Sequence, residues 1–187
     1  MTIRIIAAAF LALPVALSAQ MPMQPGQSMA GMGGEGAPPA TCPATPAPLP
    51  PELAGWAGRA PVVAASDDAG LAAAMLVPGK GADVALKPTP SVRYPTRPSH
   101  PGGSVSSGGL LAFDVAQAGT YRVAIGSGAW LEVVRDGQAV ESTAHGHGPA
   151  CTGIGKMVDF PLTQGRYLLE IAGNGSPAIP VLVTRLP

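Results

Sequence analysis

The chain has 187 residues, a formal net charge of zero and only 12% charged residues. It lacks the basic surplus that a nucleic-acid-binding face requires, so nucleic acid is not expected as a partner. Hydrophobic residues make up 47% of the chain, but many are alanines, which bury little apolar area. A core must therefore depend on a modest set of larger aliphatic and aromatic side chains.

Residues 1–19 are typical of a secretory signal. Arg4 precedes an apolar stretch, 5–17, that is too short to span a bilayer. Leu17-Ser18-Ala19 fits the small-residue cleavage pattern, so the mature chain should begin near Gln20. A membrane anchor is the alternative. We expect an exported protein, periplasmic or extracellular, with no transmembrane segment after cleavage.

Residues 20–52 form a leader with two biased segments. The first contains four closely spaced methionines: Met21, Met23, Met29 and Met32. Thioether sulfurs are soft ligands that suit Cu(I), so these residues are a candidate copper site; ordinary low-complexity sequence is the alternative. The second segment, 37–51, is dense in proline, which favours an extended backbone and excludes a helix. We therefore expect a flexible, disordered leader.

The chain has two cysteines, Cys42 and Cys151. In an exported protein two cysteines most simply form a disulfide, because the compartment is oxidising. A bridge that closes a loop of roughly 100 residues stabilises a fold by about 4–5 kcal/mol in the chain-entropy model. The alternative is a free Cys151 thiolate that acts as a nucleophile or a metal ligand.

Residues 53–187 are expected to form one all-β domain. Two segments, 119–125 and 165–171, both begin with glycine and place Tyr, an aliphatic residue and Ile on one face. This period-two alternation is typical of half-buried strands. We expect strands at 110–116, 119–126, 129–136, 155–162, 165–173 and 178–186, with a tight turn at Asp136-Gly137. Their regular spacing favours an antiparallel β-sandwich or a jelly-roll-like barrel.

The first part of the domain gives weaker signals. Ser66-Asp67-Asp68 is suited to cap a short helix that ends at Pro78-Gly79, although an irregular loop fits the same residues. Short strands are expected at 82–86 and 91–94. A loop rich in Pro, Gly and Ser is expected at 95–109.

His145 and His147 are the most specific candidate site. Histidines at positions i and i+2 of an extended segment project to the same side, so both imidazoles could reach one ion such as Cu, Zn or Fe(II). Glu141 and His100 are available as a third ligand, but the sequence places neither beside the pair. The alternatives are a glycine-rich loop with exposed or hydrogen-bonded histidines, and an acid–base role.

Trp130 is a second candidate, either as a core residue or as a stacking platform for a ligand such as a sugar ring. Trp56 is expected to pack the leader against the sheet. Arg122 and Glu170 both occupy outward positions in the two repeated segments, so they should form an ion pair if their strands are neighbours. The sequence contains no nucleophile elbow, phosphate-binding loop, zinc-protease motif or dinucleotide-binding motif.

Segments 102–113, 118–130 and 142–151 taken together resemble those of short exported bacterial proteins called homogentisate 1,2-dioxygenase. The resemblance extends over the domain from about Cys42 onward. It implies an Fe(II)-dependent, cupin-type oxygenase, in which His145 and His147 resemble the paired histidines of the first cupin motif. Pro149-Ala-Cys-Thr-Gly153 stands where that motif has its carboxylate, and no histidine follows His147. The resemblance therefore supplies two of the three ligands that such an iron site needs, His145 and His147.

The strand region also resembles, in architecture alone, the small sandwich modules of secreted hydrolases, which bind rather than cut. The sequence thus supports three hypotheses. The first, which we favour, is an exported binding or envelope-associated module for a small ligand or envelope component, with its site in the loop 142–152 and no catalytic residue assigned. The second is a homogentisate 1,2-dioxygenase-like metal-dependent oxygenase, and the third is a periplasmic copper-binding protein.

Overall fold

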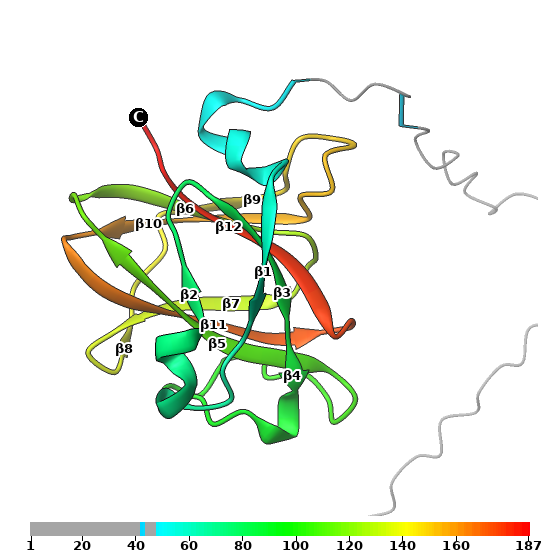
Figure 1. The fold of residues 1–187 in the computed structure, drawn as a ribbon, viewed down its shortest axis with the longest axis vertical. Coiled ribbons are helices and arrows are strands. Elements are labelled where there is room, and N and C mark those ends of the chain that lie inside the picture. Colours follow the sequence, from blue (N-terminus) through cyan, green and yellow to red (C-terminus); the bar gives the residue numbers. More distant parts are fainter. Residues whose placement is uncertain (1–41, 44–47) are drawn as a thin grey trace, which may run out of the picture. The chain divides into compact units, whose positions relative to one another are not determined.

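Two β-sheets pack face to face around a common core (Figure 1). The computed structural model describes residues 42–43 and 48–187, which lie within the unit Thr41–Pro187. The predicted signal sequence and the four leader methionines, Met21, Met23, Met29 and Met32, fall outside the described residues. The expected all-β sandwich is confirmed.

The first sheet, sheet A, has the strand order β1-β3-β12-β6-β10-β9. Its strands are β1 (Arg59–Val63), β3 (Gly81–Ala85), β12 (Ala178–Arg185), β6 (Gly119–Ile125), β10 (Lys156–Leu162) and β9 (Ala144–Gly146). The second sheet, sheet B, has the order β2-β5-β11-β7-β8, and β4 also pairs with β5. Its strands are β2 (Met75–Leu76), β5 (Ser107–Val115), β11 (Gly165–Asn174), β7 (Trp130–Arg135), β8 (Gln138–Ala139) and β4 (Lys87–Pro88). Short 3-10 helices lie at η1 (Pro51–Trp56), η2 (Asp68–Ala73) and η3 (Thr89–Ser91).

Strands that follow one another in the chain mostly lie in different sheets. From β5 to β12 only the pairs β7–β8 and β9–β10 are consecutive within one sheet. The alternation leaves β12 between β3 and β6, and it leaves β11 between β5 and β7. Two layers threaded in this way form a jelly-roll-like sandwich.

Two strand pairs depart from the expected antiparallel arrangement. β1 runs parallel to β3, and β2 runs parallel to β5. Parallel neighbours need a crossover connection rather than a tight hairpin. Here the chain supplies it by crossing to the opposite sheet, since β2 lies between β1 and β3 in sequence and β3 lies between β2 and β5. Both sheets are therefore mixed.

The six strands expected after Leu110 are all present, with small shifts at their ends. The Asp136-Gly137 turn joins β7 to β8, and Arg135 pairs with Gln138 across it. Asp136 and Gly137 have φ values of 52° and 74°. A two-residue hairpin of type I′ requires positive φ at both central positions, which explains the Asp-Gly sequence.

The two repeated segments bury their tyrosines in the same way. Tyr121 of β6 donates a hydrogen bond to the carbonyl of Gln117 at 3.0 Å. Tyr167 of β11 donates to the carbonyl of Thr163 at 3.1 Å, again four residues earlier. Both rings lie in the main core between the sheets. Each bond fixes the turn that leads into its strand, as the tyrosine corner does in other sandwiches.

The segment 91–94 was predicted to be a strand, and this is wrong. Residues 92–94 are an irregular strap that follows η3, and the Tyr94 hydroxyl donates to the carbonyl of Ile171 in sheet B at 2.9 Å. Prolines at positions 88, 90 and 95 leave this region short of backbone donors for a strand ladder. A Cβ at Gly108 would overlap the Tyr94 oxygen, so glycine permits the close approach.

The helix expected after Ser66 is the 3-10 helix η2, which is shorter than the sequence suggests. Asp67 caps it as expected, because its carboxylate accepts a hydrogen bond from the Gly70 N–H at 3.3 Å. The helix ends before Met75, where the chain enters β2. The described residues contain no helix both long and apolar enough to cross a membrane.

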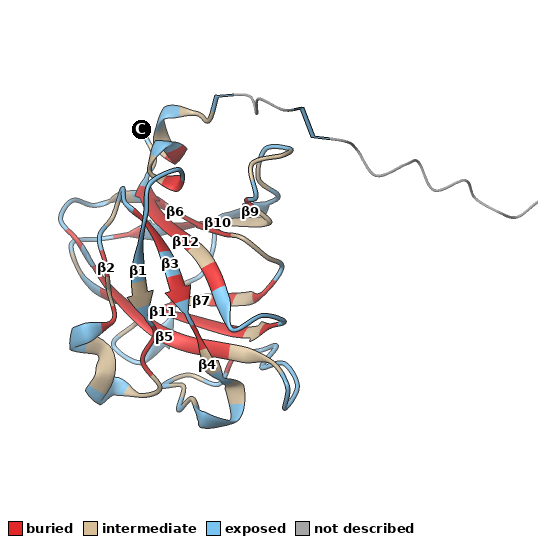
Figure 2. Ribbon diagram, turned by 45° about the vertical axis from the view of Figure 1, so that its right-hand side comes forward, coloured by how far each residue is buried: buried red, intermediate tan, exposed pale blue. Residues whose placement is uncertain are grey.

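A second, smaller core lies between η1 and the outer face of sheet A (Figure 2). Its buried members are Leu53, Trp56, Ala124, Ile154 and Leu182. Side chains alternate along a strand, so Val123 faces the main core while Ala124 faces outward to η1. Trp56 also donates from its indole N–H to the carbonyl of Thr152 at 2.9 Å. The expected packing of Trp56 on the sheet is confirmed.

Candidate functional site

A pocket of about 410 Å³ lies between the β7–β8 edge of sheet B and the β9–β10 edge of sheet A. Its apolar walls include Leu131, Val140, Val158 and Phe160. Its polar groups are Trp130, Glu132, Glu141, Ser142, His145 and Lys156. Apolar walls combined with a few converging polar groups are the usual form of a small-molecule site.

Of the two predicted histidines, His145 lines this pocket. β9 places it opposite Val158 of β10, so its side chain shares the sheet face that carries the main core. His147 follows the end of β9, and its Nδ1 lies 3.0 Å from the carbonyl oxygen of Gly155. A carbonyl only accepts, so Nδ1 of His147 is the donor. His147 is thus engaged with the backbone and does not line the pocket.

The other candidate ligands are dispersed. Glu141 lines the pocket with His145, whereas His100 packs on the ring of Trp130, with centroids 4.3 Å apart. Within residues 42–43 and 48–187, no three His, Cys, Asp or Glu side chains lie close enough together to hold a metal ion. A facial iron site needs three ligands, so the described residues do not fit the Fe(II) centre that the resemblance implies. Metal binding through His145 and His147 stays a prediction.

Trp130 is a half-buried residue at the pocket rather than a fully buried core residue. Its indole N–H donates to Oε1 of Glu132 at 2.9 Å. Nζ of Lys156 lies 5.0 Å from its ring centroid, and His100 contacts the same ring. These three contacts hold the indole in one orientation beside the pocket.

Lys156 was missed by the sequence reasoning. It is the first residue of β10, on the same face as Val158 and Phe160, and its Nζ donates to the carbonyl of Ala129 at 3.2 Å. Burial lowers the pKa of Lys156. The alternation along β10 was the available signal, because it places position 156 on the inward face.

Two carboxylates lie side by side on the outer face of sheet B. Glu132 of β7 is directly opposite Glu170 of β11, which is 1% exposed. The backbone N–H and the hydroxyl of Thr96 donate to the Glu170 carboxylate at 3.1 and 2.7 Å. Burial raises the pKa of Glu170, the Thr96 hydrogen bonds oppose this shift, and the neighbouring Glu132 adds to it. Burial, with a contribution from Glu170, also raises the pKa of Tyr94 to about 12.

The ion pair between Arg122 and Glu170 was expected only if their strands were neighbours, and this condition is not met. Their strands, β6 and β11, lie in different sheets and are not neighbours. Arg122 instead pairs with Asp159 of the adjacent β10, with Nε 2.7 Å from Oδ1. Glu170 is buried and accepts its hydrogen bonds from Thr96, which lies just after the irregular segment 92–94.

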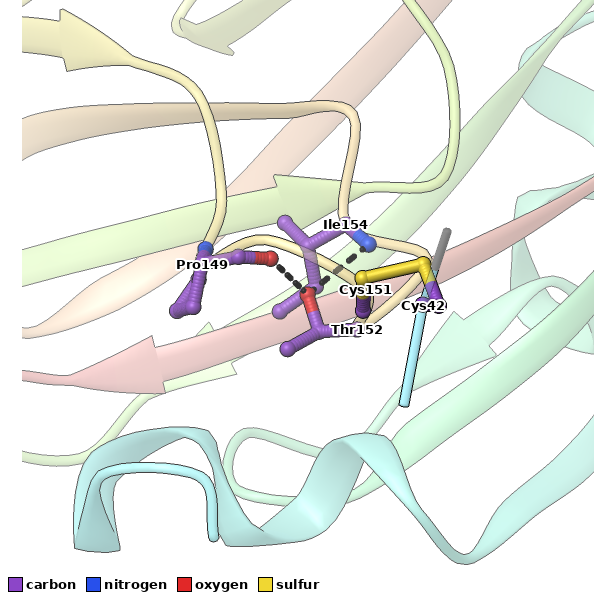
Figure 3. Close-up of a disulfide and its surroundings, with 5 residues drawn as sticks. All are labelled: Cys42, Pro149, Cys151, Thr152 and Ile154. Atoms are coloured by element: carbon purple, nitrogen blue, oxygen red, sulfur yellow. Dashed lines mark hydrogen bonds between the residues drawn. A yellow bond between two sulfur atoms is a disulfide. The ribbon is translucent and has the colours of Figure 1, made fainter. Parts of the chain in front are cut away.

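Cys42 and Cys151 form the expected disulfide, with Cα atoms 5.4 Å apart and a sequence separation of 109 (Figure 3). Cys151 lies in the loop between β9 and β10. The Thr152 hydroxyl donates to the carbonyl of Pro149 at 2.7 Å and accepts from the Ile154 N–H at 3.3 Å. Because its sulfur is in the bridge, Cys151 is not available as a thiolate nucleophile or metal ligand.

Comparison of the chain with models of protein families and with curated proteins gave no match in either case. The pocket is therefore the feature of the molecule that points to a function. The structure brings two of the predicted residues, Trp130 and His145, to this pocket together with Glu141. Glu132 and Lys156 join them from β7 and β10, which lie in different sheets.

Proposed function

We propose that this protein is an exported binding module that takes a small organic ligand in the pocket between β7–β8 and β9–β10. The observation that carries the proposal is the pocket itself, with its apolar walls and its converging polar groups. Export is supported by the signal-like residues 1–19 and by the Cys42–Cys151 disulfide, since such bonds persist in oxidising compartments.

The lining of the pocket defines the class of ligand. Leu131, Val158 and Phe160 are buried residues, so they offer an apolar surface to a ring or a short chain. Glu141 and His145 are exposed, so they offer hydrogen bonds at the mouth. A volume of about 410 Å³ suits a small ligand. We therefore expect a molecule with an apolar body and one or more polar groups.

The two tryptophans of the chain provide a direct test by NMR. Trp130 lines this pocket, whereas Trp56, the last residue of η1, lines a separate hollow with Leu49 and Arg59, so the two indoles report on different sites. Benzyl alcohol, benzoate and benzylamine are titrated separately into 15N-labelled protein. At least one of them should shift the Trp130 indole resonance while the Trp56 resonance stays in place. The variant Trp130→Phe assigns the two resonances. If none of the three probes moves the Trp130 resonance, or if both indoles shift alike, the pocket is not the binding site.

His145 and His147 offer a matched pair of variants for the same titration. His145 lines the pocket, and His147 contacts the carbonyl of Gly155. We expect His145→Ala to weaken the binding of the active probe several-fold and His147→Ala to leave it unchanged. Equal effects of the two substitutions would contradict a role for the pocket mouth.

The two rival functions are tested separately. Iron in the purified protein together with homogentisate-dependent oxygen uptake would replace the binding proposal by the oxygenase. Copper handling depends on Met21, Met23, Met29 and Met32, which lie outside the described residues. Calorimetric titration with Cu(I), for the mature chain and for a chain lacking 20–36, would detect it as heat that the deletion removes.

A further inference from the structure

Of the described lysines and arginines, Lys156 is the one that lines the pocket, and it forms no ion pair. Four arginines, Arg59, Arg122, Arg135 and Arg166, each form an ion pair with an aspartate. Within the described part of the chain, no carboxylate lies within ion-pair distance of Lys156. Its Nζ contacts the carbonyl of Ala129 and the ring of Trp130 instead.

Lys156 is half-buried and lines the pocket, so its amine is partly desolvated at a place that a ligand can reach. A lysine reacts as a nucleophile only when it is neutral, and a partly desolvated site without a counter-charge favours the neutral form. Burial lowers the pKa of Lys156 in agreement with this geometry. The amine also lines a pocket large enough for a ligand, between the apolar side chains of Val158 and Phe160 and the indole of Trp130.

We propose that Lys156 binds an aldehyde or ketone ligand covalently, as an imine, inside the pocket. This inference rests on the proposed binding function and narrows its ligand class to small carbonyl compounds with an apolar body. Lys80 is exposed and Lys87 lies on the short strand β4, and neither lines this pocket. Of the three lysines of the chain, Lys156 should therefore be the one that reacts preferentially with such a ligand.

The step needs only the amine and the carbonyl compound. The lone pair of neutral Nζ attacks the carbonyl carbon and forms a C–N bond, and a proton passes from nitrogen to oxygen to give a carbinolamine. Loss of that hydroxyl as water, with a proton supplied by an acid, forms the C=N bond. Glu141 and His145 at the pocket mouth are the groups placed to exchange this proton. The aldehyde oxygen leaves as water, and no redox partner takes part.

Reductive trapping tests the proposal on the mature, disulfide-bonded chain. The protein is incubated with benzaldehyde and cyanoborohydride, which reduces an imine to a stable benzylamine, and peptide mapping measures the modification at each amine. We expect Lys156 to be modified several-fold faster than Lys80, Lys87 and the N-terminal amine. Equal rates at all lysines, or slower reaction at Lys156, would overturn the proposal.

Two controls separate this inference from the binding function. Lys156→Arg keeps a cation but removes the primary amine, so it should abolish the trapped adduct at this site, whereas Lys87→Arg should leave it unchanged. Benzyl alcohol has the same ring but no carbonyl, and its effect on the Trp130 indole resonance reports non-covalent binding. A shift with benzyl alcohol but no adduct at Lys156 rejects the imine alone. If no adduct forms and none of benzyl alcohol, benzoate and benzylamine shifts the Trp130 resonance, both proposals fail. The comparison of the three lysines in the unmodified sequence holds even if the variant does not fold.

Discussion

Two bidentate arginine–aspartate pairs on the outer faces of the two sheets have nearly the same geometry and different surroundings. Arg122 of β6 donates to Asp159 of β10 at 2.7 and 2.8 Å, and Arg166 of β11 donates to Asp114 of β5 at 2.9 and 3.1 Å. Each arginine adjoins the buried tyrosine of its repeated segment. Paired N–H···O bonds of this kind are the strongest form of the interaction.

The pairs differ in how far they are covered. The side chains of Arg122 and Asp159 are 22% and 10% exposed, whereas those of Arg166 and Asp114 are 66% and 57% exposed. η1 packs on the sheet face that carries the first pair, and the Cys42–Cys151 bond joins Cys42, ahead of η1, to the loop between β9 and β10. Solvent screens an exposed pair almost completely, while removal of one partner from a covered pair leaves an unmatched charge. The contribution of each pair to the stability of the fold therefore depends on how far the pair is shielded from solvent rather than on its hydrogen-bond geometry.

Of the changes that test this comparison, removal of the disulfide should cause the largest loss of stability. The double variant Cys42→Ser, Cys151→Ser is expected to lose about 4 kcal/mol of unfolding free energy, because its unfolded chain regains the freedom of a long loop. Urea denaturation of the variant and of the oxidised parent measures the loss. The parent protein under reductant is the matched control and should coincide with the variant. Equal stability of all three would show that the covering of sheet A does not depend on the tether.

The substitution Asp159→Asn should have the next largest effect. It leaves the guanidinium of Arg122 largely covered without its counter-charge, so we expect a loss of about 2 kcal/mol of unfolding free energy. The same denaturation experiment measures it. An unchanged midpoint would mean that water solvates Arg122 as well as Asp159 does.

Glu170→Gln tests the opposite face, where a buried carboxylate has no arginine. The folded pKa of Glu170 is raised above its ordinary value of 4.5. The stability linked to its protonation is therefore fully present below the unfolded pKa and is lost as the pH rises through the folded pKa. Gln does not titrate, so the variant should match the parent at low pH and exceed it at neutral pH by less than about 1 kcal/mol. A variant that is less stable than the parent at neutral pH would show that the ionised form is favoured at this position.

Asp114→Asn should have the smallest effect of the four. Both side chains of the Arg166–Asp114 pair are exposed, so we expect no measurable change in the urea midpoint. This substitution is chemically identical to Asp159→Asn and serves as its matched control. If the two variants lost equal stability, coverage by η1 would not be the property that distinguishes the pairs.

The strands after Leu110 could be predicted because each carries a strict alternation or a turn of defined chemistry. Tyr121 and Tyr167 mark the inward face of their strands, and Asp136-Gly137 marks a hairpin. β1 could not be found in the same way, since almost all of its residues are exposed and Pro61 interrupts it. An exposed edge strand leaves no periodic pattern.

The periodic pattern of a strand does not predict which strands lie next to it in a sheet. Arg122 and Glu170 both occupy outward positions in their segments, yet the chain path assigns them to different sheets and different partners. The site shows the same limit. Trp130 and His145 were predicted from their residue types, but Lys156 reaches Trp130 only because β10 and β7 meet across the sandwich. Such contacts depend on tertiary arrangement rather than on local sequence.

The bond between Cys42 and Cys151 has a mechanical consequence. β1 to β9 all lie between the two cysteines, so they belong to a closed covalent ring. Tension applied ahead of Cys42 passes through the sulfur atoms directly to Cys151 and bypasses every strand of that ring. In a chain pulled from its two ends, β10, β11 and β12 are therefore the strands that bear the load, and the bond shields β1 to β9 from it.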